Sequence, residues 1–135
     1  MISRGKRSDN GDWIEGFYCA YGHTGDIKHY IIPEYASALY AIEIIQKTAG
    51  RYTGMVDKNK TRIFEGDIVR STETGELGIV QWYEEHAAFL VWCPSPNQVG
   101  FLYECALIVE IVGNIHDNRD ILKETQDDRK MCLLR

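Results

Sequence analysis

The pattern that most constrains this chain is a series of short β-type runs separated by tight turns between residues 51 and 116. Each run is rich in β-branched and aromatic residues, which favour strands. The runs are Arg51–Met55, Ile68–Arg70, Ile79–Tyr83, Ala88–Trp92, Phe101–Ala106 and Leu107–Val112. Turn residues separate them, including an Asp-Lys-Asn-Lys stretch in which Asn59 suits a positive φ. Several short strands with tight turns are typical of a small barrel, so we predict an SH3-like β-barrel over residues 51–116.

The first third of the chain predicts a β-hairpin. Trp13–Tyr21 and Ile27–Ile32 are two strand-like runs, and the glycines of Gly22–Asp26 supply the turn between them. Residues 13–50 therefore form an N-terminal β-rich region. Residues 1–12 are polar and are expected to form a flexible arm, and residues 117–135 a short helix followed by a charged tail. The predicted fold class is mainly β.

Residues 34–46 fit two patterns. Tyr35, Leu39 and Ile42 have helical spacing, whereas Tyr40, Ile42 and Ile44 alternate as in a strand. We favour a turn or short helix over residues 34–38, followed by a strand over residues 39–45.

The motif Glu65-Gly66-Asp67 has two interpretations. Paired carboxylates can divide acid and base roles between them, or bind a metal. However, no further carboxylate or histidine is spaced nearby to complete such a site. The favoured interpretation is structural: Gly66 permits a bend into a strand, and Asp67 accepts backbone N–H groups. We predict no catalytic, cofactor-binding or metal-binding residues, and no enzymatic activity.

Composition excludes several classes of protein. The chain has no long apolar run that could cross a membrane and no apolar core of a signal peptide near its start, so we expect a cytoplasmic protein without a membrane partner. The four cysteines form no CxxC pair, which argues against a zinc knuckle. The net charge is −5, but residues 64–115 hold eight acidic side chains and one basic side chain, a net charge of −7.

Two groups of basic residues are candidates for phosphate contact. Lys58, Lys60 and Arg62 lie in and after the predicted turn, and Arg4, Lys6 and Arg7 lie near the N-terminus. They support an alternative function as a nucleic-acid-binding accessory protein. The net charge of −7 over residues 64–115, which make up most of the predicted barrel, argues against that use of its surface, because nucleic-acid binding requires cations that displace counterions.

Aromatic residues in the predicted barrel are either core residues or anchors for a partner. Trp and Tyr dominate the energetics of protein interfaces. The candidate partner-binding residues are Trp82, Trp92 and Tyr103.

Four short motifs together resemble the YopX family of phage and prophage proteins. They are Tyr52-Thr53-Gly54, Asp57-Lys58-Asn59, Phe64-Glu65-Gly66-Asp67 and Gly113-Asn114-Ile115. The resemblance covers about residues 13–122. Lys60 stands where the family often has glycine, and Glu43–Gly50 stands where it usually has a Pro-Glu-Thr stretch.

The resemblance implies a β-rich fold with an SH3-like barrel, a tendency to self-associate, and no assigned enzymatic activity. We therefore expect a non-enzymatic, self-associating protein-interaction module, present in a bacterial host and binding an unidentified host or phage protein. Nucleic acid is the less favoured partner, and no cofactor is expected.

Overall fold

The computed structural model describes residues 2–36, 40–94 and 97–122, and its described part is mainly β, as predicted. The chain divides into two compact units, an N-terminal unit (Met1–Tyr52) and a C-terminal unit (Thr53–Arg135). No helix in the described ranges is long and apolar enough to cross a membrane.

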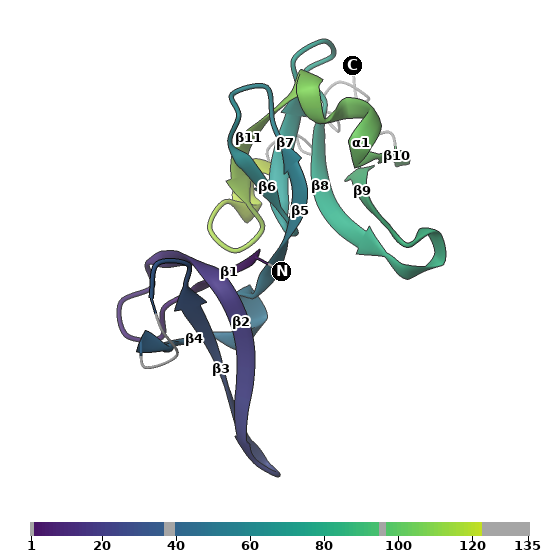
Figure 1. Ribbon diagram of the computed structural model, residues 1–135. Coiled ribbons are helices and arrows are strands. Elements are labelled where there is room, and N and C mark those ends of the chain that lie inside the picture. Colours follow the sequence, from purple (N-terminus) through teal and green to yellow (C-terminus); the bar gives the residue numbers. More distant parts are fainter. Residues whose placement is uncertain (1, 37–39, 95–96, 123–135) are drawn as a thin grey trace. The chain divides into compact units, whose positions relative to one another are not determined.

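Figure 1 labels the strands and the helix α1. The N-terminal unit holds β1 (Ile2–Lys6), β2 (Trp13–His23), β3 (Asp26–Pro33), β4 (Ile42–Ile44), the 3-10 helix η2 (Gln46–Thr48) and the start of β5 (Gly50–Val56). The C-terminal unit continues with β6 (Arg62–Phe64), β7 (Asp67–Ser71), β8 (Leu77–Tyr83), η3 (Glu84–His86), β9 (Ala88–Cys93), β10 (Gln98–Phe101), α1 (Leu102–Cys105), η4 (Ala106–Ile108) and β11 (Val109–Asn114).

These strands form two antiparallel sheets. One has the order β4-β3-β2-β1-β5-β6, and β5 spans the division between the units. The other has the order β10-β9-β8-β7-β11 and lies in the C-terminal unit. The predicted hairpin is confirmed: β2 and β3 pair from Gly16 opposite Pro33 to His23 opposite Asp26.

The N-terminus differs from the flexible arm that we expected. Ile2–Lys6 is a strand, β1, which pairs with β2 on one side and with β5 on the other. Ser3 and Gly5 are buried, and a Cβ atom on Gly5 would lie 2.6 Å from Ile44 Cδ1. The buried side of β1 is therefore made of small residues, which carry no hydrophobic signal in the sequence.

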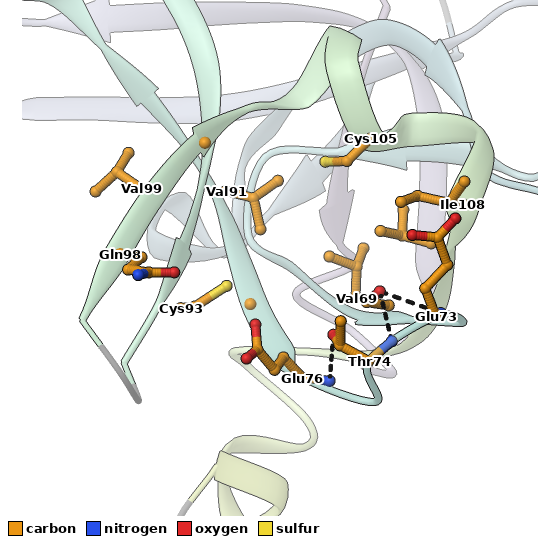
Figure 2. Close-up of a pocket in the computed structure, with 14 residues that line it drawn as sticks. Val69, Glu73, Thr74, Glu76, Val91, Cys93, Gln98, Val99, Cys105 and Ile108 are labelled. Atoms are coloured by element: carbon orange, nitrogen blue, oxygen red, sulfur yellow. Dashed lines mark hydrogen bonds between the residues drawn. The ribbon is translucent and has the colours of Figure 1, made fainter.

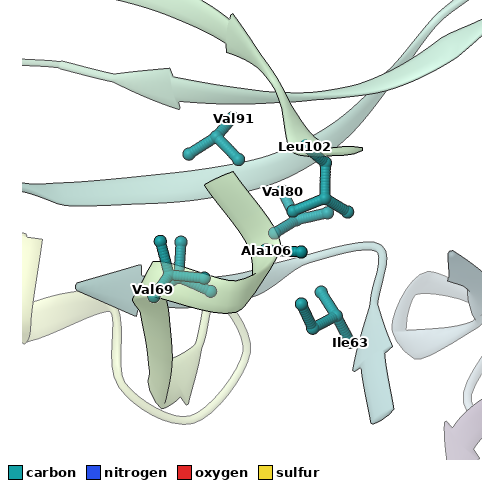
Figure 3. Packing of buried hydrophobic residues seen from close by; sticks show 7 residues of the cluster. Ile63, Val69, Val80, Val91, Leu102 and Ala106 are labelled. Atoms are coloured by element: carbon teal, nitrogen blue, oxygen red, sulfur yellow. The ribbon is translucent and has the colours of Figure 1, made fainter. Parts of the chain in front are cut away.

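The core of the C-terminal unit is an aliphatic cluster drawn from both strands and helices (Figure 3). Its members are Ile63, Val69, Val80, Val91, Leu102, Ala106 and Val109. The strand that we predicted over Phe101–Ala106 is wrong beyond Phe101, because α1 and η4 occupy residues 102–108. Leu102 and Ala106 are four residues apart, so a helical turn directs both toward the core.

The closed barrel is not found in the described part of the C-terminal unit. The five-stranded sheet stays open, and β10 and β11 form its two ends. Residues 102–108 form α1 and η4, and Leu102 and Ala106 of this segment pack in the core.

Two turns test predictions about individual residues. Gly66 has φ of +94°, which confirms its role in a bend that other residues rarely adopt. In the Asp57–Thr61 turn the positive φ belongs to Lys60, at 65°, and not to Asn59 as predicted.

The predictions for residues 34–46 and for residues 117–135 are confirmed in part. Residues 34–36 form a turn, and the strand predicted over 39–45 is shorter, Ile42–Ile44. Residues 37–39 lie outside the described ranges. Residues 119–122 are helical, as predicted for the start of a short C-terminal helix, and the predicted tail lies outside the described ranges from residue 123 onward.

Candidate protein-interaction site

The longest strand pair in the N-terminal unit extends beyond its neighbours. β1 pairs with β2 only as far as Phe17, and β4 pairs with β3 only over His29–Ile31. Residues 18–28, which we call the distal hairpin, therefore pair only within the β2–β3 strand pair in the described sheet. Figure 1 shows β2 and β3 continuing together past β1 and β4. A two-stranded hairpin in water is marginally stable by itself, and its open edges can pair with another chain.

The distal hairpin and its base expose large apolar side chains. Tyr21 is 77% exposed, Ile27 56%, Phe17 46% and Tyr18 42%. Successive residues of a strand point to opposite faces, so Phe17 and Tyr21 lie on one face and Tyr18 on the other. Ile27 is opposite Gly22 and shares the face of Tyr18. Within the described part of the N-terminal unit, no second layer covers either face of the distal hairpin, and exposed apolar surface of this kind is typical of a site that meets a partner.

Local contacts hold the distal hairpin in a defined form. A Cβ atom on Gly22 would lie 2.2 Å from the carbonyl oxygen of Asp26, so only glycine permits this close approach of the two strands. The Tyr18 hydroxyl is hydrogen-bonded to Nδ1 of His29, and the two rings are stacked with centroids 5.7 Å apart. These contacts reduce the side-chain freedom that would be lost on binding.

The structure does not bring the predicted partner-binding residues together. Trp82 and Trp92 are half-buried and point to opposite faces of the five-stranded sheet, since Trp82 is opposite Phe89 while Trp92 is opposite Ile79. The Trp82 ring packs edge-on against Phe89 at 4.9 Å. Nε1 of Trp92 donates a hydrogen bond to Oδ1 of Asn97, at 2.9 Å. Only Tyr103, on α1, is well exposed, at 63%.

The turn predicted as a phosphate contact is fixed by an internal carboxylate. Asp57 is buried, and its Oδ1 accepts hydrogen bonds from the backbone N–H groups of Asn59 and Thr61, at 2.8 and 3.0 Å. Its Oδ2 accepts one from the N–H of Ile111 on β11, at 3.0 Å. Asp57 therefore shapes the turn and joins it to β11.

The three basic residues near this turn do not form one cationic surface. Nζ of Lys58 lies 3.7 Å from Oε2 of Glu110, so its charge is partly neutralised. Lys60 is exposed on the turn, and Arg62 is half-buried in β6. Whether any of them contacts phosphate stays a prediction.

The basic residues of the N-terminus are also engaged. The Arg4 guanidinium lies 4.7 Å from the centroid of the Trp13 ring, and Nζ of Lys6 lies 5.5 Å from it. Arg7 donates two hydrogen bonds to the Asp9 carboxylate, at 2.9 and 2.7 Å. This pairing raises the pKa of Arg7 and lowers the pKa of Asp9.

The Glu65-Gly66-Asp67 corner has the geometry of its structural interpretation. Asp67 is buried, and its Oδ2 accepts a hydrogen bond from the N–H of Phe64, at 2.7 Å. The N–H of Gly66 donates to the carbonyl of Val80, at 2.8 Å. In the described ranges, no three His, Cys, Asp or Glu side chains gather as a metal site would require.

Sequence reasoning missed the exposed side chains of the distal hairpin, although a signal was present. Phe17, Tyr18, Cys19, Ala20 and Tyr21 are consecutive apolar residues, so both faces of the strand are apolar. A strand of this kind must either be buried on both faces or meet a partner. The points at which β1 and β4 stop pairing with β2 and β3 decide whether the strand is covered or exposed, and only the structure shows these points.

The four sequence motifs that resemble the YopX family all lie in the described part of the chain. The family model described as YopX protein matches residues 4–123. The chain belongs to the YopX family. A search of curated proteins found no match. The match begins at Arg4 in β1 and continues past β11, so most of β1 and the whole distal hairpin lie inside the YopX region.

Proposed function

We propose that this YopX family protein is a non-enzymatic interaction module of phage or prophage origin that self-associates through the distal hairpin, in the cytoplasm of a bacterial host. The observation that carries the proposal is the extension of β2 and β3 beyond β1 and β4, with Tyr21 and Ile27 exposed on opposite faces. A second copy of the chain is the favoured occupant because it offers the same open edges and apolar faces, as a two-fold interface requires.

The features of the C-terminal unit support a role as a structural scaffold and not as a catalytic domain. We propose that it is a partly open SH3-like barrel. β7 to β10 follow one another as an antiparallel meander, and β11 returns to pair with β7. The buried carboxylates of Asp57 and Asp67 both accept backbone hydrogen bonds, which assigns them to the scaffold.

The oligomeric state of the full chain tests the proposal. Light scattering coupled to size exclusion, at loading concentrations of about 10–100 μM, where weak oligomers form, should give a mass above that of one 15.5 kDa chain. A Tyr21→Lys variant should shift the protein toward the monomer, because the substitution removes an aromatic anchor and places a charge in each copy's interface.

The matched control is Tyr103→Lys, which makes the same substitution at an exposed tyrosine in the other unit. We expect it to leave the mass unchanged. A wild-type protein that stays monomeric over the whole range would contradict self-association. Dissociation by Tyr103→Lys with no effect of Tyr21→Lys would move the interface to the C-terminal unit.

A further inference from the structure

The C-terminal unit contains an apolar pocket at the gap between the two ends of its open sheet. The pocket has a volume of about 270 Å³. One side is formed by β10, through Gln98, Val99 and Gly100, and the other by the end of β7, the turn after it, η4 and β11. Figure 2 shows Val99 and Gln98 on one side, Ile108 and Glu73 on the other, and Val91 and Cys93 between them. We call this cavity the seam pocket.

The floor of the seam pocket is apolar and its two thiols are neutral. Val69, Val91 and Val109 belong to the buried core and also line the pocket. Burial raises the pKa of the Cys93 and Cys105 thiols, so both remain uncharged at neutral pH. The floor therefore favours an apolar group over an ionic one.

The wall formed by β10 has an open strand edge. In the described ranges β10 pairs with β9 and with no strand on its other side. Gln98, Val99 and Gly100 are exposed, and a Cβ atom on Gly100 would have no atom within 4 Å. An extended peptide can pair with such an edge through its backbone and place every second side chain in an adjacent pocket.

The opposite rim of the seam pocket is negatively charged. Glu73 and Glu76 both line the pocket, and neither forms an ion pair with another residue in the described part of the chain. The turn that holds them is ordered by hydrogen bonds, since the N–H groups of Glu73 and Thr74 both donate to Oγ of Ser71, at 3.3 and 3.2 Å. The rim therefore presents two carboxylates, carried by an ordered turn, to whatever enters the pocket.

We propose that the seam pocket binds an extended segment of a partner protein in which apolar side chains alternate with lysine or arginine. The segment adds as a strand to β10, its apolar side chains enter the pocket, and its basic side chains meet Glu73 and Glu76. The open edge, the apolar floor and the acidic rim each supply one of these requirements. This site goes beyond the proposed self-association and uses residues of the other unit.

The probe is a fluorescent peptide, Lys-Val-Lys-Val-Lys-Val-Lys, titrated with the full chain and followed by anisotropy. Two peptides test its chemistry: one with glycine in place of each valine, and one with glutamate in place of each lysine. We expect the Lys-Val probe to bind the protein at least about fivefold more tightly than either the glycine-substituted or the glutamate-substituted peptide. Equal binding of the valine and glycine peptides would show that the pocket is not used, and would overturn the proposal.

A charge-matched pair of variants tests the rim. Glu73→Lys with Glu76→Lys should weaken binding of the probe by about tenfold or more, because two attractive pairs become repulsive. Glu84→Lys with Glu85→Lys makes the same change in net charge on η3, away from the pocket, and should weaken binding by less than about twofold at 150 mM salt, where distant charges are screened. Equal losses in the two variants would show non-specific attraction and overturn the proposal.

Backbone amide NMR of the wild-type protein locates the peptide independently of any variant. We expect the largest shift changes at residues 98–101. Changes confined to other strands would overturn the proposal. A second outcome would also overturn the proposal. If the double variant Glu73→Lys with Glu76→Lys changes the mass of the protein but not its binding of the probe, the occupant of the pocket is a second copy of the chain. Loss of self-association in Tyr21→Lys with unchanged binding of the probe is the result expected if the two sites are separate.

Discussion

Asp57 offers a sharp test of how the C-terminal unit is built. The residue is 2% exposed, and its carboxylate accepts three backbone hydrogen bonds, from Asn59 and Thr61 in its own turn and from Ile111 on β11. The backbone adds a further link, since the N–H of Lys58 donates to the carbonyl of Val109, at 3.0 Å. Replacing the carboxylate should therefore destabilise both the turn and its attachment to β11.

The expected loss follows from the fate of each donor. In Asp57→Ala the N–H of Ile111 loses its partner in a half-buried position, which costs about 1–3 kcal/mol. The turn residues Asn59 and Thr61 are exposed, so their N–H groups can bind water, and the loss of each bond costs about 0.5–1 kcal/mol. The total is about 2–5 kcal/mol. Asp57→Asn keeps one acceptor oxygen but turns an amide N–H₂ toward a donor, so about half of that loss is expected.

Urea unfolding followed by tryptophan fluorescence measures this change. With an m-value of about 2 kcal/mol/M, the midpoint of Asp57→Ala should fall by about 1–2.5 M. Glu110→Gln is the control, because it removes only the surface pair with Lys58, whose contribution is at most about 1 kcal/mol. Unfolding free energies of wild type and Asp57→Ala within about 0.5 kcal/mol of each other, a difference typical of neutral surface substitutions, would refute the assignment of Asp57 to the scaffold.

Three further predictions follow from single features. Gly66→Val should lower the unfolding free energy by about 1–3 kcal/mol, because φ is +94° while the nearest atoms to an added Cβ are at ordinary contact distances; an unchanged melting temperature would contradict this. The raised pKa values of Cys93 and Cys105 mean that the folded protein holds these protons longer than the unfolded chain. The protonated thiols therefore stabilise the folded state fully below the ordinary thiol pKa, and this stabilisation is lost as pH rises through the raised pKa values. The urea midpoint of the wild-type protein should fall above about pH 9. It should fall less in the double variant Cys93→Ala with Cys105→Ala, which lacks both thiols. Labelled DNA and RNA should show no micromolar binding at 200 mM salt by anisotropy, and such binding would restore the nucleic-acid alternative.

The central strands of the C-terminal unit were predictable from sequence because several signals agree there. At least half of the residues of β8 and β9 are β-branched or aromatic, β7 contains the pair Ile68-Val69, and each strand is bounded by turn residues. The bend at Gly66 was predictable for the same reason, since a glycine beside an aspartate just before an apolar run marks a turn. Local preference and final structure coincide at these positions.

β1 could not be predicted, because its place depends on distant residues. Ile2–Lys6 is mostly polar, and its buried positions are occupied by Ser3 and Gly5. At position 5 the closeness of Ile44 requires glycine, and the sequence alone does not reveal this contact. A polar strand between two other strands is stabilised by its backbone pairing with β2 and β5, and that pairing leaves no hydrophobic pattern.

α1 was mispredicted because tertiary packing overrode a strand-like sequence. Phe101–Ala106 contains aromatic residues that favour strands, but a strand would direct Leu102 and Ala106 to one face together with Glu104. A helical turn buries Leu102 and Ala106 while Glu104 stays exposed. The exposed carboxylate is therefore the local sign that a helical turn fits this segment better.

The acidic residues of the segment 64–115 fall into two groups in the structure, those that are buried or paired and those that are exposed. Asp67 is buried and bonded to the backbone, and Glu110 lies beside Lys58, so neither adds a free charge to the surface. Glu73 and Glu76, by contrast, are exposed at the rim of the seam pocket. A phosphate approaching that rim meets repulsion, whereas a lysine or arginine side chain meets attraction, and both effects act at short range at physiological salt. The same charge that argues against nucleic acid at this surface therefore argues for a basic peptide.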